Sequence, residues 1–440
     1  MNYSQALEFL DSFINYEKDH LFEYPEAFKL DRMRSLAKEF GNPQNSFESI
    51  LIAGSKGKGS TAAFLSSILR MENFKTGLYT SPHLTDVRER VRVNGLQLPE
   101  SRFIEFMGRM KKIMEEYSWK KNPPTYFEVL TAMAFHHFKE MKVQVAVLEV
   151  GLGGLYDSTN IAPAKVAGLA PISLEHTDKL GKTISKIAVQ KCGIIKGREW
   201  VVTAPQNEEA LRVIEAACAE REAPLFRVGK DLRIFEREYE EDYQKMDLRT
   251  PWANYYDLKI CLRGAHQMEN AALAVALAKA LTQRTRLTVS ESSVRQGLLD
   301  TRWPGRLEKV SDRPRIILDG AHTVDSAQKM LRALKRHFRF SDLIVVLGLV
   351  HDKDAEGILS AVTPECRTIF LTEFQNPRAI SSRELAQQAP LSLGNVVVEA
   401  DPREALLKAR ALAGPEDLVL VTGSLYLVAH LRDFILMEQL

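Results

Sequence analysis

The sequence predicts an α/β protein of two domains, each built on an open sheet with flanking helices, with the second domain the smaller. Short β-branched apolar runs alternate with segments of helical period along most of the chain, a pattern typical of parallel sheets. The 440 residues exceed what one ordinary hydrophobic core holds, and 45% of them are apolar, which is enough for two cores. A Trp-Pro-Gly break near Pro304 separates two alternating series.

The first domain is expected to contain a βαβ unit. A β-rich run at Ile50–Ala53 precedes a glycine-dense turn, an apolar-periodic helix at Thr61–Met71 and a second strand at Thr76–Tyr79. Further short, β-branched runs bounded by Gly, Pro or charge predict buried strands at Val143–Val150, Val166–Ile172 and Trp200–Ala204. These elements predict a central parallel sheet with helices on both faces.

A charged, aromatic stretch from Val228 to Leu262 then interrupts the alternation. It lacks a helical period, and we interpret it as β-hairpins or an irregular flap at the edge of the first domain. Helical texture resumes at Asn270–Leu281. We therefore assign residues 1–299 to the first domain, 300–306 to a linker and 307–440 to the second domain.

The second domain is expected to be a smaller open α/β sheet. Its predicted strands are Arg315–Asp319, Leu343–Leu349, Thr368–Phe374, Asn395–Ala400 and Leu418–Thr422. Ligands of such sheets bind beyond the carboxyl ends of the strands. Polar clusters at Asp319–His322 and Gly423–Ser424 lie at such ends.

The composition favours small soluble partners. Lys and Arg number 59 against 57 Asp and Glu, so no polybasic surface for nucleic acid or membrane is indicated. The first twenty residues do not have the pattern of a signal peptide, and no uncharged apolar run is long enough to span a bilayer. The four cysteines are far apart without any C-x-x-C pair, which fits a reducing cytoplasm.

The strongest local signal is a glycine-rich loop between a strand and a helix. Its residues are Gly54, Ser55, Lys56, Gly57, Lys58, Gly59, Ser60 and Thr61. Glycines allow backbone N–H groups to face a phosphate chain, Lys58 can reach the β and γ phosphates, and a hydroxyl of Ser60 or Thr61 can serve phosphate or Mg²⁺. The spacing departs from the strict P-loop pattern, yet a nucleotide-binding loop remains the favoured interpretation.

Two further clusters follow predicted strands. Glu149 ends an apolar strand and precedes the glycines of EVGLGG; a carboxylate there needs a cation, and Mg²⁺ beside a phosphate loop supplies one. A dinucleotide-binding fingerprint is excluded because G-x-G-x-x-G does not occur. His176 comes just after another strand, with Lys191 one helix later. Taken alone, such a histidine is more often structural than a ligand.

These clusters belong to a longer series through which the chain resembles the folylpolyglutamate synthase and dihydrofolate synthase family of Mur-type ligases. The motifs, in order, are AGSKGKGST, TSPHL with RERVRVNG, TYFE, EVGLGG with DSTN, EHTDKLG with KCGIIK, GAHQMENAA with WPGRLE, and DGAH with GSLYLV. The resemblance implies a Mur-ligase-like P-loop ATPase domain followed by a smaller Rossmann-like α/β domain.

The resemblance also implies roles for individual residues. Ser81 and Glu149 are expected to bind one Mg²⁺ and His176 a second, and Lys191 resembles the family's carbamylated lysine. Unmodified, Lys191 would instead pair with phosphate. The ATP and acyl-phosphate contacts implied from the rest of the chain are Asn270, Arg306, Asp319 and His322. The implied folate contacts are His83, Arg90, Tyr126 and Phe127, although the RERVRVNG segment also fits a solvated hairpin.

The implied activity is ATP-dependent joining of L-glutamate to folate, and possible joining to dihydropteroate, by a monomeric enzyme. A Mur ligase of cell-wall precursors is the first alternative; such enzymes usually have an N-terminal UDP-binding domain, and here the phosphate loop already occurs at Gly54. The second is a nucleotide-binding module without ligase activity. Departures from the family pattern are Ser55-Lys56 for Thr-Asn, Leu155-Tyr156 for Arg-Leu, Glu175 for Asp and Thr323-Val324 for Asn-Pro.

Overall fold

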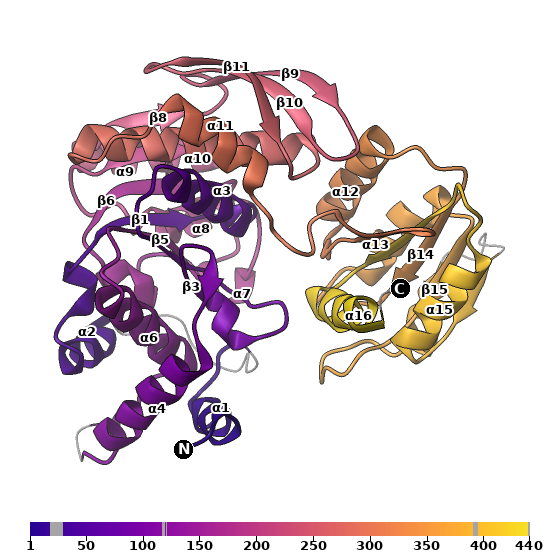
Figure 1. Ribbon diagram of the computed structural model, residues 1–440, viewed down its shortest axis with the longest axis horizontal. Helices are drawn as coiled ribbons and strands as arrows, with labels where there is room; N and C mark the ends of the chain where they lie inside the picture. Colours follow the sequence, from indigo (N-terminus) through magenta and orange to yellow (C-terminus); the bar gives the residue numbers. More distant parts are fainter. Residues whose placement is uncertain (18–29, 117–118, 120, 390–394, 439–440) are drawn as a thin grey trace.

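The computed structural model describes residues 1–17, 30–116, 119, 121–389 and 395–438, which form three sheets with flanking helices (Figure 1). Their orders are β4-β3-β2-β5-β1-β6-β7-β8, β11-β10-β9 and β12-β13-β17-β14-β15-β16. We call the part built on the eight-stranded and three-stranded sheets the first domain, and the part built on the six-stranded sheet the second domain. The predicted α/β fold class is confirmed.

The eight-stranded sheet is mostly parallel, as predicted, and its strands lie within or near the expected runs. Its parallel strands are β1 (Glu48–Ala53), β2 (Thr76–Tyr79), β5 (Val145–Glu149), β6 (Ala164–Leu169), β7 (Trp200–Thr203) and β8 (Leu225–Arg227). An antiparallel hairpin, β3 (Val91–Val93) and β4 (Leu96–Gln97), extends one edge. The RERVRVNG segment is therefore a hairpin, but Arg90 at its start is buried rather than solvated.

Strand β1 lies between two hydrophobic cores, one on each face of the eight-stranded sheet. Ile50 and Ile52 pack into the core on one face, whereas Leu51 and Ala53 pack into the core on the other, because successive side chains of a strand alternate. The first core contains α3 (Lys58–Met71), α10 (Ala265–Arg284) and α11 (Glu291–Asp300). The second contains α1 (Tyr3–Asp11), α2 (Leu30–Glu39), α4 (Glu100–Met114), α6 (Tyr126–Glu140), α8 (Ile184–Cys192) and α9 (Glu208–Glu220).

The stretch predicted as hairpins or a flap forms the three-stranded antiparallel sheet, so the hairpin interpretation is confirmed. Its strands are β9 (Arg233–Tyr239), β10 (Gln244–Arg249) and β11 (Asn254–Ile260). Met246, Leu248 and Leu258 are fully buried in the same core as α10 and α11. Figure 1 shows this sheet stacked over those two helices, so it is a packed layer of the first domain.

The second domain is an open sheet with helices on both faces. Its strands are β12 (Glu308–Asp312), β13 (Arg315–Leu318), β14 (Leu343–Leu347), β15 (Thr368–Leu371), β16 (Val396–Val398) and β17 (Leu418–Thr422). Its helices are α12 (Val324–His337), α13 (Ala355–Val362), α14 (Ser382–Gln387), α15 (Pro402–Leu412) and α16 (Leu425–Glu438). The unexpected element is β12, which pairs antiparallel with β13 at one edge.

The two domains meet along the turn between β9 and β10. His337 of α12 is buried there, accepting a hydrogen bond from the backbone of Gly264 at 3.1 Å and donating to the carbonyl oxygen of Glu240 at 2.6 Å. Arg263 donates to the carbonyl oxygen of Leu307 at 2.8 Å. These buried contacts join the domains firmly at this side.

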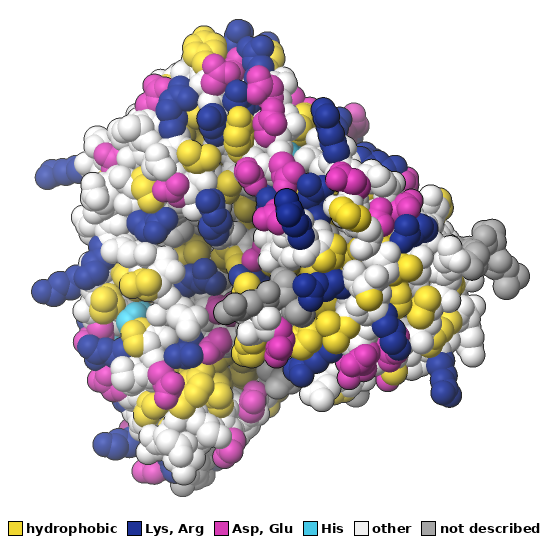
Figure 2. All heavy atoms as spheres, turned by 45° about the vertical axis from the view of Figure 1, so that its right-hand side comes forward, with side chains coloured by type: hydrophobic (Ala, Val, Ile, Leu, Met, Phe, Trp, Pro, Cys, Tyr) yellow, Lys and Arg dark blue, Asp and Glu magenta, His cyan; other side chains and the backbone are white. Residues whose placement is uncertain are grey.

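The surface agrees with the balanced composition. Basic and acidic side chains intermingle over the face shown in Figure 2. No helix among the described residues combines the length and the apolar character needed to cross a membrane. The sequence predicts no signal peptide in the first twenty residues. Residues 18–20 of this stretch lie outside the part of the chain that the structure describes.

Candidate active site

The phosphate loop connects β1 to α3 and contains two glycines with positive φ. Gly54 has a φ of 151° and Gly57 a φ of 81°. A Cβ atom on Gly57 would lie 2.4 Å from Oδ1 of Asn270, and one on Gly54 would lie 2.7 Å from Cβ of Ala170. Glycine is therefore required at both positions, and the loop lies directly against Asn270.

The first half of the loop is fastened to the segment after β6. The backbone N–H groups of Ser55 and Lys56 donate to the carbonyl oxygen of Pro171 at 2.8 and 3.3 Å. The hydroxyl of Ser55 donates to the carbonyl oxygen of Ser173 and accepts from its N–H, both at 3.0 Å. The amides left to face an anion are those of the first turn of α3, from Gly57 to Ser60, where the helix dipole is positive.

Two lysines converge on the carbonyl oxygen of Gly54. Lys58 donates to it at 2.9 Å and Lys191 at 2.8 Å, while Lys191 also donates to Glu175 at 2.7 Å. Burial lowers the pKa of Lys191 to about 8, against the opposing charge of Glu175. Burial acts to raise the pKa of Glu175, but the charges of Lys191 and Lys58 outweigh it and lower that pKa to about 2. Two ammonium groups thus face one carboxylate, an excess of positive charge suited to phosphate.

Glu149, at the end of β5, is a buried carboxylate without a cation. Its side chain accepts a hydrogen bond from the N–H of Ser81 at 3.2 Å, and in the described part of the chain it has no salt bridge. Burial raises its pKa to about 7, although Lys58 opposes this. A buried carboxylate in this condition fits a metal cation. Among the described residues, no group of three or more His, Cys, Asp or Glu side chains is placed to hold a metal by itself, and this includes the surroundings of Glu149.

Asp157 holds the glycine turn after Glu149 and was not predicted as a site residue. It is 1% exposed and accepts hydrogen bonds from the backbone N–H groups of Gly151 at 3.0 Å and Leu152 at 3.1 Å. It also accepts from the N–H of Thr159 at 2.9 Å. Its place in the DSTN motif was the available signal. The role of Asp157 is to orient the turn beside Glu149.

His176 comes just before the short helix α7 (Thr177–Leu180), and it is accessible from solvent at the rim of the site. Its φ of 44° places it in the left-handed region. Partial loss of hydration lowers the pKa of His176 and of His322, and the charge of Lys353 lowers both further. The charge of Lys353 in the second domain therefore acts on both histidines, and its ammonium group pairs with Asp352 at 2.7 Å. Lys353 was not predicted as a site residue, although its position soon after the predicted strand Leu343–Leu349 was a signal.

In the second domain, Asp319 and His322 lie at the carboxyl end of β13, as predicted. Asp319 accepts hydrogen bonds from the N–H groups of Leu307 at 2.9 Å and Ala321 at 2.8 Å, so its carboxylate fixes the backbone around it. Nδ1 of His322 donates to the carbonyl oxygen of Gly320 at 2.8 Å, which leaves Nε2 as the acceptor of the neutral ring. A Cβ atom on Gly320 would lie 2.8 Å from Nη1 of Arg306. The structure therefore brings these three predicted residues together.

Asn270 is buried against the phosphate loop near the start of α10. Its side-chain nitrogen donates to Oε1 of Gln267 at 3.0 Å. The preceding residue, Glu269, borders a hollow of about 360 Å³. The other residues lining this hollow are Pro205, Val228, Gly229, Arg233, Ile234 and Phe235. Asn270 itself does not line this hollow.

Three of the four predicted folate contacts lie together. Arg90 is 1% exposed; its guanidinium donates two hydrogen bonds of 2.6 Å to Glu17 and one of 2.9 Å to Nδ1 of His83. It lies over the ring of Tyr126, 5.7 Å from the centroid. Phe127 lies apart from this group, close to Gly151 and to Tyr79, whose ring centroid is 5.8 Å away. The charge of Arg90 is thus already paired, and its evident effect is to orient His83.

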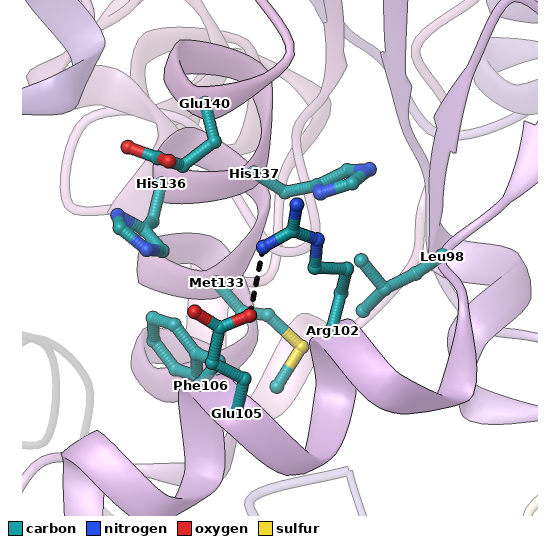
Figure 3. A pocket seen from close by; sticks show the side chains of 8 residues that line it. All are labelled: Leu98, Arg102, Glu105, Phe106, Met133, His136, His137 and Glu140. Atoms are coloured by element: carbon teal, nitrogen blue, oxygen red, sulfur yellow. Dashed lines mark hydrogen bonds and ion pairs between the residues drawn. The ribbon is translucent and has the colours of Figure 1, made fainter.

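A second, small cavity lies between α4 and α6 and takes no part in this site (Figure 3). Its volume is about 20 Å³, room for roughly one water molecule. Figure 3 shows Arg102 pointing between His136 and His137 and paired with Glu105 at 2.8 Å. None of its lining residues belongs to the phosphate loop or to the strand ends beside it.

Comparison with known proteins assigns the family. Residues 52–278 match the Mur ligase middle domain, and residues 305–425 match the Mur ligase glutamate ligase domain. The chain is 33% identical over 405 residues to the dihydrofolate synthase/folylpolyglutamate synthase of Bacillus subtilis, spanning 92% of this chain and 94% of that protein. The chain belongs to the folylpolyglutamate synthase and dihydrofolate synthase family of Mur ligases. The resemblance seen in the sequence is confirmed.

Solved structures of this family share the whole fold. Folylpolyglutamate synthase of Mycobacterium tuberculosis, complexed with ADP, has a TM-score of 0.89 and 30% identity, covering 98% of each chain. FolC of Escherichia coli, in complex with DHPP and ADP, has a TM-score of 0.86 and 30% identity, covering 100% of this chain and 99% of that one. The family's fold therefore extends over both domains of this chain.

Proposed function

We propose that this chain is an ATP-dependent ligase that joins L-glutamate to a folate carboxylate through an acyl phosphate. The observation that carries the proposal is the pairing of two opposite sites. Lys58 and Lys191 converge on Gly54 with excess positive charge, and Glu149 is buried beside them without a cation. An anion site next to a cation site is what a metal–triphosphate complex requires.

The chemistry explains why ATP is needed. A carboxylate is a poor electrophile, and its oxygen is a poor leaving group until it is phosphorylated. Lys58 and the amides of the first turn of α3 would spread the charge of the γ-phosphoryl group during its transfer to the folate carboxylate. The amine of glutamate then attacks the acyl carbon and phosphate leaves, which forms the amide bond.

The residues present fit Mg²⁺. Glu149 and the hydroxyl of Ser81 would hold one ion beside the triphosphate, and His176 would be a ligand of a second. When bound, Mg²⁺ neutralises phosphate charge and polarises the phosphoryl group. The bound ion would then offset the free-energy cost of burying the ionised side chain of Glu149.

Lys191 is proposed to carry a carbamate in the active enzyme. Its pKa of about 8 leaves a substantial fraction of neutral amine near neutral pH, the form that attacks CO₂. A bond forms between Nζ and the carbon, and a proton is released to water. Because the product is an anion next to Glu175, we expect the modification only when metal ions are bound. The two ammonium groups describe the metal-free protein; in the active enzyme, Lys58 and the metal ions would supply the positive charge that faces the phosphates.

The second domain is proposed to deliver groups to the other side of the reacting atoms. Arg306 would bind phosphate, and Asp319 with His322 would support the nucleotide and the acyl phosphate. The charge of Lys353 acts on both His176 and His322, and its ammonium group pairs with Asp352 at 2.7 Å. We propose that Lys353 exchanges this partner for a carboxylate of the incoming glutamate. Closure over the site would exclude water, which otherwise hydrolyses the acyl phosphate.

The substrates would bind on either side of the phosphate loop. Asn270 would contact adenine, with the hollow beside Glu269 as space for the base. The folate would lie near His83, Tyr126 and Phe127, with Arg90 holding His83 through the hydrogen bond described above. The Bacillus subtilis relative, named both dihydrofolate synthase and folylpolyglutamate synthase, supports dihydropteroate as a second acceptor.

The test is to incubate the protein with ATP, Mg²⁺, L-glutamate and either tetrahydrofolate or dihydropteroate. ADP should form only when glutamate and an acceptor are both present, and mass spectrometry should show the acceptor extended by glutamate. Extension of dihydropteroate would establish the second activity. ADP formation without an extended product, or activity only with a UDP-sugar peptide, would refute the proposal.

A further inference from the structure

In the described part of the chain, one ion pair connects the phosphate loop to the second domain. Nζ of Lys56 lies 2.7 Å from Oδ2 of Asp325 and donates to the hydroxyl of Thr323 at 3.4 Å. The backbone of Lys56 is fixed by its hydrogen bond to Pro171, so its ammonium group contacts the second domain from a fixed position in the first. The N–H and the ammonium group of Lys56 are therefore both engaged within the protein, and neither is turned to the phosphate site.

Asp325 lies in the first turn of α12, in a tightly bonded cap next to His322. The hydroxyl of Ser326 accepts hydrogen bonds from the N–H groups of His322 at 3.1 Å and Thr323 at 2.9 Å. Thr323 and Ser326 also form the capping box of the helix. Because these residues are joined by short local bonds, a displacement of Asp325 displaces His322.

We propose that the Lys56–Asp325 ion pair is a latch that positions His322 over the phosphate loop, an inference that rests on the proposed ligase function. Lys56 and Asp325 are positioning residues. Their side chains are 38% and 48% exposed, so the pair is weak and can open in each turnover. The buried contacts of His337 hold the domains together on the opposite side of α12, at its last residue. The second domain is thus fixed at one end of this helix and latched at the other.

The test uses charge reversal at Asp325, which lies outside the proposed binding residues. In Asp325→Lys, two like charges meet, and kcat at saturating ATP should fall on the order of tenfold, with a smaller fall of roughly two- to fivefold in Asp325→Asn. The double variant Lys56→Glu/Asp325→Lys restores the attraction and should regain most of the lost kcat. The nucleotide dissociation constant of the two single variants, Asp325→Lys and Asp325→Asn, should stay near the wild-type value.

Lys329 offers a matched control, because it also pairs with Asp325, at 3.1 Å, but within α12. Lys329→Ala should leave kcat within about twofold of wild type. The proposal is overturned if Asp325→Lys and Asp325→Asn behave like Lys329→Ala, or if the double variant is no more active than Asp325→Lys. Melting temperatures of all variants identify any that fail to fold, and Asp325→Asn remains as the isosteric test.

Small-angle scattering of the ligand-free protein tests the latch independently of ligase activity, because it measures how the two domains are arranged. Asp325→Lys should increase the radius of gyration, and the double variant should reverse the increase. An unchanged radius in Asp325→Lys would contradict the latch. Failure of the ligase proposal would appear instead as wild-type protein that does not extend folate, whatever the scattering shows.

Discussion

Lys58 and Lys191 share one acceptor: both donate a hydrogen bond to the carbonyl oxygen of Gly54, at 2.9 and 2.8 Å. Among the residues that the structure describes, Glu175 is the only carboxylate at hydrogen-bond distance from either ammonium group. Like charges brought this close repel each other, and a bound phosphate would relieve the repulsion. The two ammonium groups therefore favour the binding of an anion at the first turn of α3.

Replacing Lys58 tests the transition-state role of this pair. Lys58→Ala should reduce ligation on the order of a hundredfold or more, because a charged donor to the transferring phosphoryl group is lost. Folding should be largely kept, since the side chain is only partly buried. Steady-state kinetics and a melting curve measure the two effects. A variant that keeps most of its turnover would contradict the assignment of the loop.

Substitutions of Lys191 test the proposed carbamate. Lys191→Ala should be nearly inactive and partly rescued by a small added carboxylate, whereas Lys191→Arg should stay inactive because it cannot form the carbamate. Activity of the unaltered protein should also respond to dissolved CO₂. Full activity of Lys191→Arg, or a crystal structure with Mg²⁺ and nucleotide bound that shows an unmodified lysine, would leave Lys191 as a direct phosphate contact.

Glu149 should make the metal-free protein less stable as pH rises. The pKa of its carboxyl is raised by burial to about 7 in the folded protein, above the ordinary value of 4.5, so the folded state binds more protons between these values. Stability is therefore lost as pH rises from about 4.5 to 7 and stays lower above. Glu149→Gln should raise the free energy of unfolding at pH 8 by on the order of 2–3 kcal/mol, with little change at pH 4.

The same variant should lose its response to the metal–nucleotide complex. Mg²⁺ with ATP should raise the melting temperature of the wild-type protein but not that of Glu149→Gln. Glu140→Gln, an exposed carboxylate on α6, is the control and should change stability by less than about 0.5 kcal/mol. If Glu149→Gln and wild type have equal free energies of unfolding at pH 8, burial of the ionised carboxylate does not destabilise the folded protein.

Gly57 should not tolerate a methyl group. At a φ of 81°, with Oδ1 of Asn270 only 2.4 Å from the position of a Cβ, Gly57→Ala should cost about 1–2 kcal/mol of stability or more and weaken nucleotide binding. Gly108→Ala in α4 is the matched control, because a Cβ there meets nothing within 4 Å. It should stabilise the protein by roughly 0.5–1 kcal/mol. Chemical denaturation and nucleotide titration measure both, and a stable, tightly binding Gly57→Ala would contradict the geometry.

The parts of the site that could be predicted are those that depend on short, local sequence patterns. The glycine loop, Glu149 at a strand end, and Asp319 with His322 at another strand end follow from strand–loop–helix order, because parallel strands bring their carboxyl ends to one edge. The convergence of Lys191 on Gly54 was not predictable from spacing, since it depends on how α8 packs beside the loop. The convergence appeared only in the folded chain.

Long-range charge pairing explains the other omissions. The burial of Arg90 against Glu17 joins residues from distant segments, and the sequence alone made the RERVRVNG hairpin equally consistent with a solvated surface. Lys56 was expected to serve phosphate as part of a local loop. Its ammonium group instead meets Asp325 of the second domain, a contact set by the arrangement of the two domains.

The most direct test of the ligase account follows the oxygen atoms of the folate carboxylate. A folate labelled with a heavy oxygen isotope in its reacting carboxylate is incubated with the protein, ATP, Mg²⁺ and L-glutamate, and the released phosphate is examined by mass spectrometry. If the carboxylate attacks the γ-phosphorus and is later displaced at carbon by the amine, each amide bond formed should transfer one labelled oxygen to phosphate. Phosphate released without the label, while the folate is extended, would contradict the acyl phosphate.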